Sequence, residues 1–228
     1  MNHDQVGDPT YTQAVEELLG ALAYAELSGY LRVAADAQSA PTLSLQITLG
    51  SISARAWQNF DNLNAHISQA GADIDALMQP FVRAVDQFHE RTPSKDWLEG
   101  LVKAYVGDEI ARDFYREVAR RVDPATRAVV DAVLDDRGQS QALADLLRRA
   151  IEENPTSAGR LALWGRRLVG EAIAQTQHVA ADHDALAALL IGAWEQEDEQ
   201  ADLVELGRML TRLTEAHTAR MRRVGLAS

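Results

Sequence analysis

The sequence contains no cysteine among its 228 residues. Disulfide bonds, iron–sulfur clusters, thiolate zinc sites and cysteine nucleophiles are therefore excluded. A chain without disulfide-forming residues is typical of a reducing compartment, so we expect a cytoplasmic protein. No apolar run approaches the length of a membrane span, and residues 1–10 lack the basic and apolar regions of a signal peptide. We expect no membrane association, and a disordered segment at 1–10.

Basic residues are scarce relative to acidic ones. The chain has 22 lysines and arginines against 34 aspartates and glutamates, which gives a formal net charge of −12. A surface of this charge repels polyanions unless its basic residues cluster on one face. Nucleic acid is therefore an unlikely partner on charge alone.

The alternation of apolar and polar residues that marks β-strands is missing, whereas apolar residues recur at helical spacing throughout. The sequence therefore predicts an all-α fold. Proline and glycine breaks divide it into expected helices at 11–37, 42–70, 73–90, 95–122, 124–153 and 156–181, a short apolar piece at 186–194, and a final helix after the acidic run 195–200.

The order of two long helices, a shorter crossover and two more long helices is that of a four-helix bundle with one long connection, the ferritin-like plan. We expect this bundle to comprise residues 11–154. Residues 155–228 are expected to form additional C-terminal helices that pack on the bundle within the same domain.

Three acids lie on otherwise apolar stripes near the middle of their predicted helices. These are Glu26, Asp108 and Asp136. Mid-helix positions of antiparallel neighbours lie at the same level, so the three carboxylates are expected to converge inside the bundle. Burying an ionised carboxylate costs several kcal/mol, by order of magnitude, unless it is paired, protonated or bound to a metal. The sequence therefore predicts a cation beside them.

The other ligands of a di-iron bundle are absent. Such centres take a glutamate from each of two helices and a Glu-x-x-His pair from each of the other two. The helix at 42–70 carries Arg55 and Gln58 at that spacing, Gln139 follows Asp136 by three residues, and no Glu-x-x-His occurs in the chain. A metal-free polar core is therefore favoured over a single weakly held metal, and no metal is expected.

Four segments resemble a known family. Together they are similar to actinobacterial ferritin-like proteins related to the tRNA hydroxylase that acts on methylthio-isopentenyl-adenosine. The segments are Leu22 to Ser28 (LAYAELS), Asp96 to Glu117 (DWLEGLVKAYVGDEIARDFYRE), Gly159 to Glu171 (GRLALWGRRLVGE) and Thr214 to Met221 (TEAHTARM).

The resemblance implies a ferritin-like fold with the family's metal-binding carboxylates at Glu26, Asp108 and Asp136. Where relatives would show glutamate, histidine and histidine, this chain has Arg55, Gln58 and Gln139. We therefore expect these six residues to form a vestigial metal site. In it the guanidinium of Arg55 would bridge the carboxylates.

The charges of that site do not balance, since three carboxylates and one arginine leave −2. We expect that at least one acid is protonated or reaches water, or that another basic residue such as Arg112 turns inward.

The functional prediction has two branches. The first is a ferritin-like protein without a di-iron centre, with no catalytic or cofactor-binding residues, that binds an unidentified protein or small ligand or has a structural role. A homodimer through the C-terminal helices is one option for this branch. The alternative is a di-iron hydroxylase or oxidase related to tRNA-modifying hydroxylases, in which the carboxylates hold iron by an altered scheme.

Overall fold

The computed structural model describes residues 8–135, 138–191 and 199–226, and these residues contain helices and no strand. The all-α prediction is confirmed. The helices are α1 (Pro9–Ser39), α2 (Leu43–Gln69), α3 (Ile74–Arg91), α4 (Trp97–Ala119), α5 (Pro124–Val133), α6 (Gln139–Glu153), the 3₁₀ turn η2 (Pro155–Ser157), α7 (Ala158–Asp182), α8 (Asp184–Ile191) and α9 (Glu199–Arg223).

Several helix starts follow from side chains that cap them. The Asp123 carboxylate accepts from the backbone N–H groups of Ala125 and Thr126 at the start of α5, and Pro124 fills the first helical position. Asp8 caps α1 in the same way, so this helix begins at Pro9, inside the segment 1–10 that was expected to be disordered. Residues 1–7 lie outside the described part of the chain.

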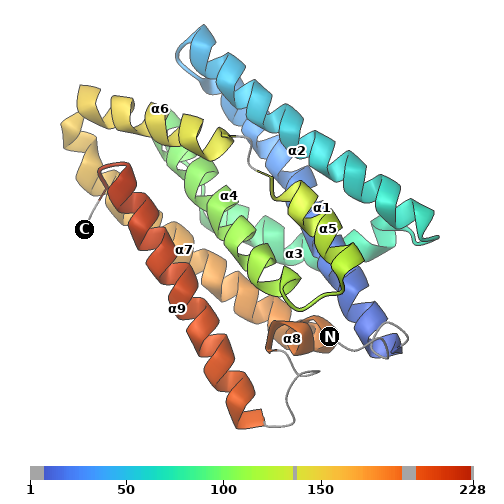
Figure 1. Ribbon diagram of the computed structural model, residues 1–228. Coiled ribbons are helices and arrows are strands. Elements are labelled where there is room, and N and C mark those ends of the chain that lie inside the picture. The colour runs from blue at the N-terminus through green and yellow to red at the C-terminus, as the bar shows by residue number, and fades with distance from the viewer. Residues whose placement is uncertain (1–7, 136–137, 192–198, 227–228) are drawn as a thin grey trace.

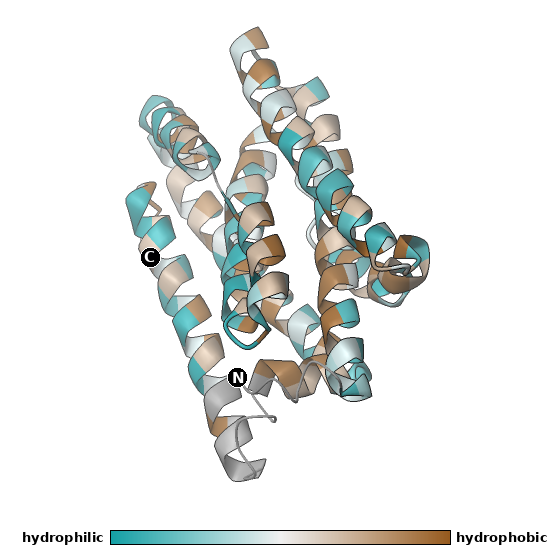
Figure 2. Ribbon diagram, turned by 45° about the vertical axis from the view of Figure 1, so that its right-hand side comes forward, coloured by the Kyte–Doolittle hydropathy of each residue, from teal (hydrophilic) through white to brown (hydrophobic). Residues whose placement is uncertain are grey.

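The long helices pack side by side (Figure 1). The most extensive contact joins α1 and α2, which are antiparallel, and α3 crosses back over α1. The other half of the molecule is built on α4, which packs against α7, α6 and the outer helix α9. Polar residues cover the outer faces of these helices, whereas apolar residues turn toward neighbouring helices (Figure 2).

The helix predicted at 124–153 is interrupted, which corrects the sequence analysis. Helix α5 ends at Val133 and α6 begins at Gln139, after Gly138 with a left-handed φ of 84°. The apolar stripe that placed Asp136 inside the bundle was drawn through this break. Asp136 itself lies outside the described residues.

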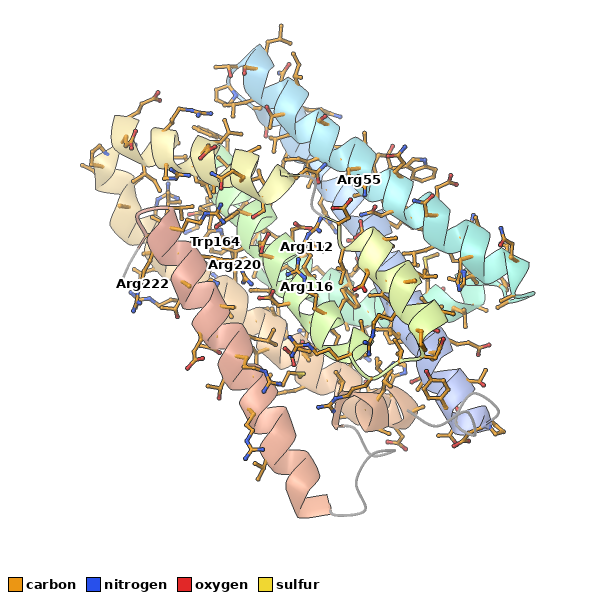
Figure 3. The ribbon with its side chains drawn as sticks, in the orientation of Figure 1. Arg55, Arg112, Arg116, Trp164, Arg220 and Arg222 are labelled. Atoms are coloured by element: carbon orange, nitrogen blue, oxygen red, sulfur yellow. The ribbon has the colours of Figure 1, made fainter. Side chains whose placement is uncertain are left out.

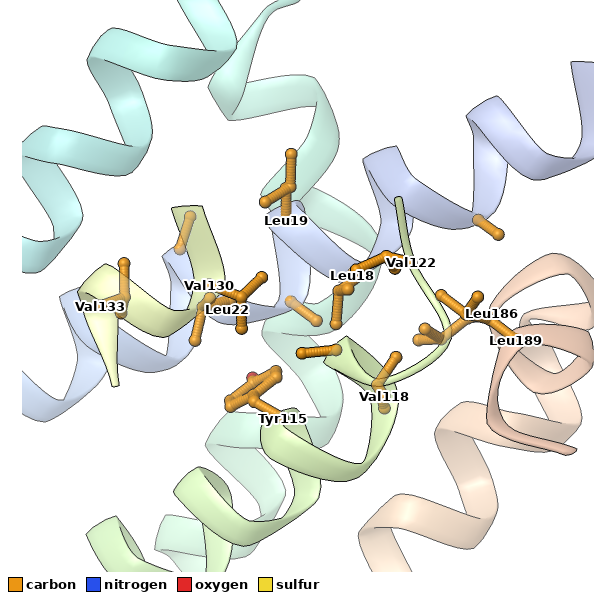
Figure 4. Close-up of a cluster of buried hydrophobic side chains, with 14 of the residues drawn as sticks. Leu18, Leu19, Leu22, Tyr115, Val118, Val122, Val130, Val133, Leu186 and Leu189 are labelled. Atoms are coloured by element: carbon orange, nitrogen blue, oxygen red, sulfur yellow. The ribbon is translucent and has the colours of Figure 1, made fainter. Parts of the chain in front are cut away.

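Two apolar clusters form the core. One joins the first half of α1 to the end of α4, to α5 and to the apolar helix α8, with Leu18, Tyr115 and Leu186 among its buried members (Figure 4). The other joins the first half of α4 to α6, α7 and the end of α9. Among the described helices, none is both long and apolar enough to cross a membrane.

The close packing of α1 on α3 generates a prediction. A Cβ added at Gly20 would lie 2.2 Å from the backbone oxygen of Leu77 and 2.7 Å from its carbonyl carbon. Because backbone cannot move aside as a side chain can, Gly20→Ala is expected to lower the free energy of unfolding by about 1–3 kcal/mol. Urea denaturation followed by circular dichroism measures this change.

The matched control is Gly107→Ala on α4, where an added Cβ would meet no atom of a neighbouring segment within 4 Å. That variant should leave stability unchanged or raise it by up to about 1 kcal/mol, since alanine favours a helix over glycine. Equal effects of the two substitutions would contradict the packing argument.

Candidate functional site

A cavity of about 670 Å³ lies between α1, α2, α3, α4 and α7. Most of its lining is apolar, and it includes two glycines, Gly29 on α1 and Gly107 on α4. A Cβ built on either glycine would meet no atom of another segment within 4 Å. The space beside these helices is therefore open.

Glu26 lies on the cavity wall near the middle of α1. The side-chain nitrogen Nδ2 of Asn59, on α2, donates to Glu26 Oε2 at 3.1 Å. The pKa of Glu26 is raised to about 8, by burial first and then by the nearby Asp108 carboxylate. The hydrogen bond from Asn59 and the charges of Arg112 and Arg55 act in the opposite direction. This carboxyl is therefore largely protonated near neutral pH.

The cation that lies inside the bundle is Arg112, one of the alternatives expected from the charge count. Its side chain is 5% exposed. Its Nε donates to Asp108 Oδ2 at 2.7 Å, and its Nη1 donates to the backbone oxygen of Leu134 at 2.7 Å. Figure 3 places Arg112 between α4 and the end of α5. Asp108, which the sequence also placed here, is thus held in an ion pair.

Three successive backbone oxygens at the end of α5 accept from side chains that line the cavity. Leu134 O accepts from Arg112, as described. Val133 O accepts from Asn59 Nδ2 at 3.1 Å, and Asp135 O accepts from Arg55 Nη2 at 3.5 Å. The last carbonyls of a helix have no partner within the helix. The inward polar side chains of α2 and α4 supply such partners here.

The prediction of which α2 residues face inward is partly wrong. Gln58 is exposed, because it lies on the outer side of the helix. The inward pair at the same spacing is Ala56 and Asn59, both of which line the cavity. Arg55 also lines it and is half-buried, but it donates to the backbone oxygen of Asp135.

Asn59 was missed by the sequence analysis although a signal was present. It lies four residues before Leu63 and eight before Ile67, on the apolar stripe of α2, and all three residues are at most 1% exposed. On α6, Gln139 lines the cavity as the first residue of the helix.

A second polar group lies further along the cavity. Lys103 Nζ donates to the backbone oxygen of Thr92 at 2.6 Å, and burial together with Arg32 lowers the lysine pKa to about 8. Burial, with the charges of Lys103 and Arg32, lowers the pKa of His89 to about 3. His89 is therefore neutral, and Asp36, whose pKa burial raises, completes this group.

The donor atoms near Glu26 do not fit a di-iron centre. Such a centre needs four carboxylates and two imidazoles, whereas the described residues contain no cluster of three or more histidine, aspartate or glutamate side chains. Of the described carboxylates at this point, Glu26 and Asp108, the second is paired with Arg112. The histidine on the cavity wall, His89, lies beside Lys103 and Arg32, whose positive charges disfavour a metal ion.

The raised pKa of Glu26 predicts how stability depends on pH. The folded protein binds this proton more tightly than the unfolded chain does, so stability falls as pH rises from about 4.5, the ordinary value, to about 8. Glu26→Gln keeps the acceptor for Asn59 but cannot ionise. Relative to the natural protein, we expect the variant to gain roughly 2–4 kcal/mol in its free energy of unfolding as pH rises across this interval.

Urea denaturation at a series of pH values measures the difference between the two proteins. The exposed carboxylate Asp61, changed to asparagine, serves as the control on the neighbouring helix. Parallel stability profiles for the natural protein and Glu26→Gln would show that Glu26 ionises as an ordinary glutamate does.

Comparison with known proteins agrees with this architecture. A family model of the ferritin-like domain of actinomycetes matches residues 9–193, which span α1 to α8. No curated protein matches the chain. The match does not extend to the tRNA hydroxylase that the sequence segments resemble, so that closer relationship stays a prediction. Because the match covers most of the chain, the protein belongs to the ferritin-like domain family of actinomycetes.

Proposed function

We propose that this ferritin-like protein has no di-iron centre and binds a small, largely apolar molecule in the cavity between α1, α2, α3, α4 and α7. The observation that carries the proposal is the commitment of the inward polar side chains. Asn59, Arg112 and Arg55 all donate to the end of α5. The interior that would hold metal ligands instead borders an apolar cavity.

The charges and the donor atoms of the site both disfavour iron. The guanidinium of Arg112 lies within the polar group and repels a second cation. Ala56 has no donor atom, and Asn59 provides a neutral amide, a weaker iron ligand than a carboxylate or an imidazole. Glu26 has no ion pair within the described part of the chain, and burial, together with the nearby Asp108 carboxylate, keeps it largely protonated.

The size and the lining of the cavity favour a bound ligand. At about 670 Å³ it falls within the range of small-molecule sites, roughly 300–1,000 Å³. Apolar walls that face water lose the free energy that their burial would give, and each glycine inside a helix costs about 0.5–1 kcal/mol relative to alanine. Gly29 and Gly107 face open space, so neither glycine is required by a packing neighbour. A ligand that fills the space explains both features.

Three further expectations from the sequence stay predictions. They are a cytoplasmic location, a poor fit to nucleic acid and a homodimer through the C-terminal helices. The alternative function, a di-iron hydroxylase or oxidase, predicts iron at Glu26, Asp108 and Asp136, and the metal measurement below decides between it and the proposal.

Iron content provides the first test. Protein produced in iron-rich medium and purified without chelators is expected to contain well below one iron per chain by elemental analysis. A di-iron ferritin-like enzyme taken through the same procedure is the positive control. About two irons per chain would overturn the proposal and favour the oxidase.

Occupation of the cavity provides the second test. The uncharged dye Nile red should bind the natural protein and gain fluorescence. Gly107→Leu directs a side chain into the cavity and is expected to weaken binding about tenfold or more. The matched control is Gly170→Leu on α7, an exposed glycine that also has no neighbour within 4 Å. Absence of dye binding by the natural protein, or equal loss in both variants, would contradict a binding cavity.

A further inference from the structure

The Asn59 side chain has one polar atom without a partner, and the atom's identity follows from its surroundings. Both hydrogens of Nδ2 are used, one by Glu26 Oε2 and one by the backbone oxygen of Val133, each at 3.1 Å. A carbonyl oxygen can only accept, so the amide nitrogen must face Val133. Oδ1 is therefore an acceptor. It has no hydrogen-bond partner among the described residues, and Asn59 is 1% exposed.

A donor without a partner lies on the same face of α2. The Nε of Arg55 is buried and makes no hydrogen bond within the described part of the chain. Residues four apart are neighbours on a helix surface, and Arg55 and Asn59 both line the cavity. Leaving such atoms unsatisfied costs about 1–3 kcal/mol each. A ligand group that both donates and accepts would recover this cost.

The charges around these two atoms discriminate against a charged ligand. Asp108 and Arg112 neutralise each other at 2.7 Å. An anionic group would accept from Arg55 but has no hydrogen to donate to Asn59 Oδ1, whose carbonyl oxygen it would face. A cationic group would suit Asn59 but would face Arg55 and Arg112. Burying a charge without a partner costs several kcal/mol, by order of magnitude.

Between this polar group and the second one, around Lys103 and Asp36, the lining of the cavity is mostly apolar. Away from this polar group the cavity passes the open glycines Gly29 and Gly107 and apolar side chains such as Val33, Ile52 and Phe88. A ligand with one polar end and an apolar body matches this distribution.

We propose, on the basis of the binding function proposed above, that the ligand is an uncharged amphiphile. Its hydroxyl or primary amide donates to Asn59 Oδ1 and accepts from Arg55 Nε, and its hydrocarbon body fills the apolar part of the cavity.

Competition against Nile red tests the ligand class. The competitors share one saturated chain and differ in the polar end: dodecanol, dodecanamide, dodecanoate and dodecylammonium, each below its critical micelle concentration and near neutral pH. Dodecanol and dodecanamide are expected to bind about tenfold more tightly than either ion. The carboxylate of dodecanoate cannot donate to Asn59 Oδ1, and the ammonium of dodecylammonium would face Arg55 and Arg112.

Arg55→Met tests the site itself. The substitution removes the donor and one positive charge but keeps an apolar side chain of similar length. We expect dodecanol and dodecanamide to bind about tenfold more weakly, dodecylammonium to bind more tightly than it does to the natural protein, and Nile red to be unaffected. The control is Gln58→Met, three residues along α2 on the exposed face.

The outcomes separate the two proposals. Equal competition by all four compounds, tightest binding of dodecanoate or dodecylammonium, or no competition by any of them despite dye binding would overturn the uncharged amphiphile and leave the cavity function standing. Failure of the natural protein to bind Nile red would overturn both. An unchanged preference in Arg55→Met would overturn the assignment to Arg55 and Asn59.

Discussion

The end of α5 is the constraint on which the interior of this protein depends. A helix that stops inside a bundle leaves its last backbone oxygens without intrahelical partners, and buried oxygens of this kind are costly. Val133 and Leu134 present two such oxygens in succession, and Asn59 and Arg112 donate to them. Arg55 donates to the oxygen of Asp135, an exposed residue just past the helix. The break between α5 and α6 and the polar residues of α2 and α4 therefore explain one another.

The same contacts determine the electrostatics of the cavity. Because Arg112 donates to the Leu134 oxygen as well as to Asp108, its guanidinium is held next to that carboxylate. Glu26 has no ion pair within the described residues, and its pKa is raised to about 8, mainly by burial. The result near neutral pH is an interior that combines the Arg112–Asp108 ion pair, a largely protonated carboxyl group at Glu26 and mostly apolar walls. Such an interior is better suited to an uncharged organic molecule than to metal ions.

Sequence reasoning located much of this site because burial and charge are local demands on a helix. Glu26 and Asp108 were placed inside from their apolar stripes, and the uneven charge count left an acid that is protonated or reaches water, or an inward basic residue such as Arg112, as alternatives. The assignment on α2 was only partly right. Arg55 does line the cavity, but Gln58 does not. The predicted pair Arg55 and Gln58 lies one residue before the inward pair Ala56 and Asn59, which has the same spacing.

The sequence by itself determined the helical class, most of the helix limits and the capping residues, because helical periodicity, proline and capping side chains act over a few residues. Only the tertiary structure decided where the helix predicted at 124–153 breaks, which amide of α2 faces Glu26, and that a cavity remains beside Gly29 and Gly107. These features depend on how helices distant in sequence approach one another. Neither the spacing of residues along one helix nor its composition contains that information.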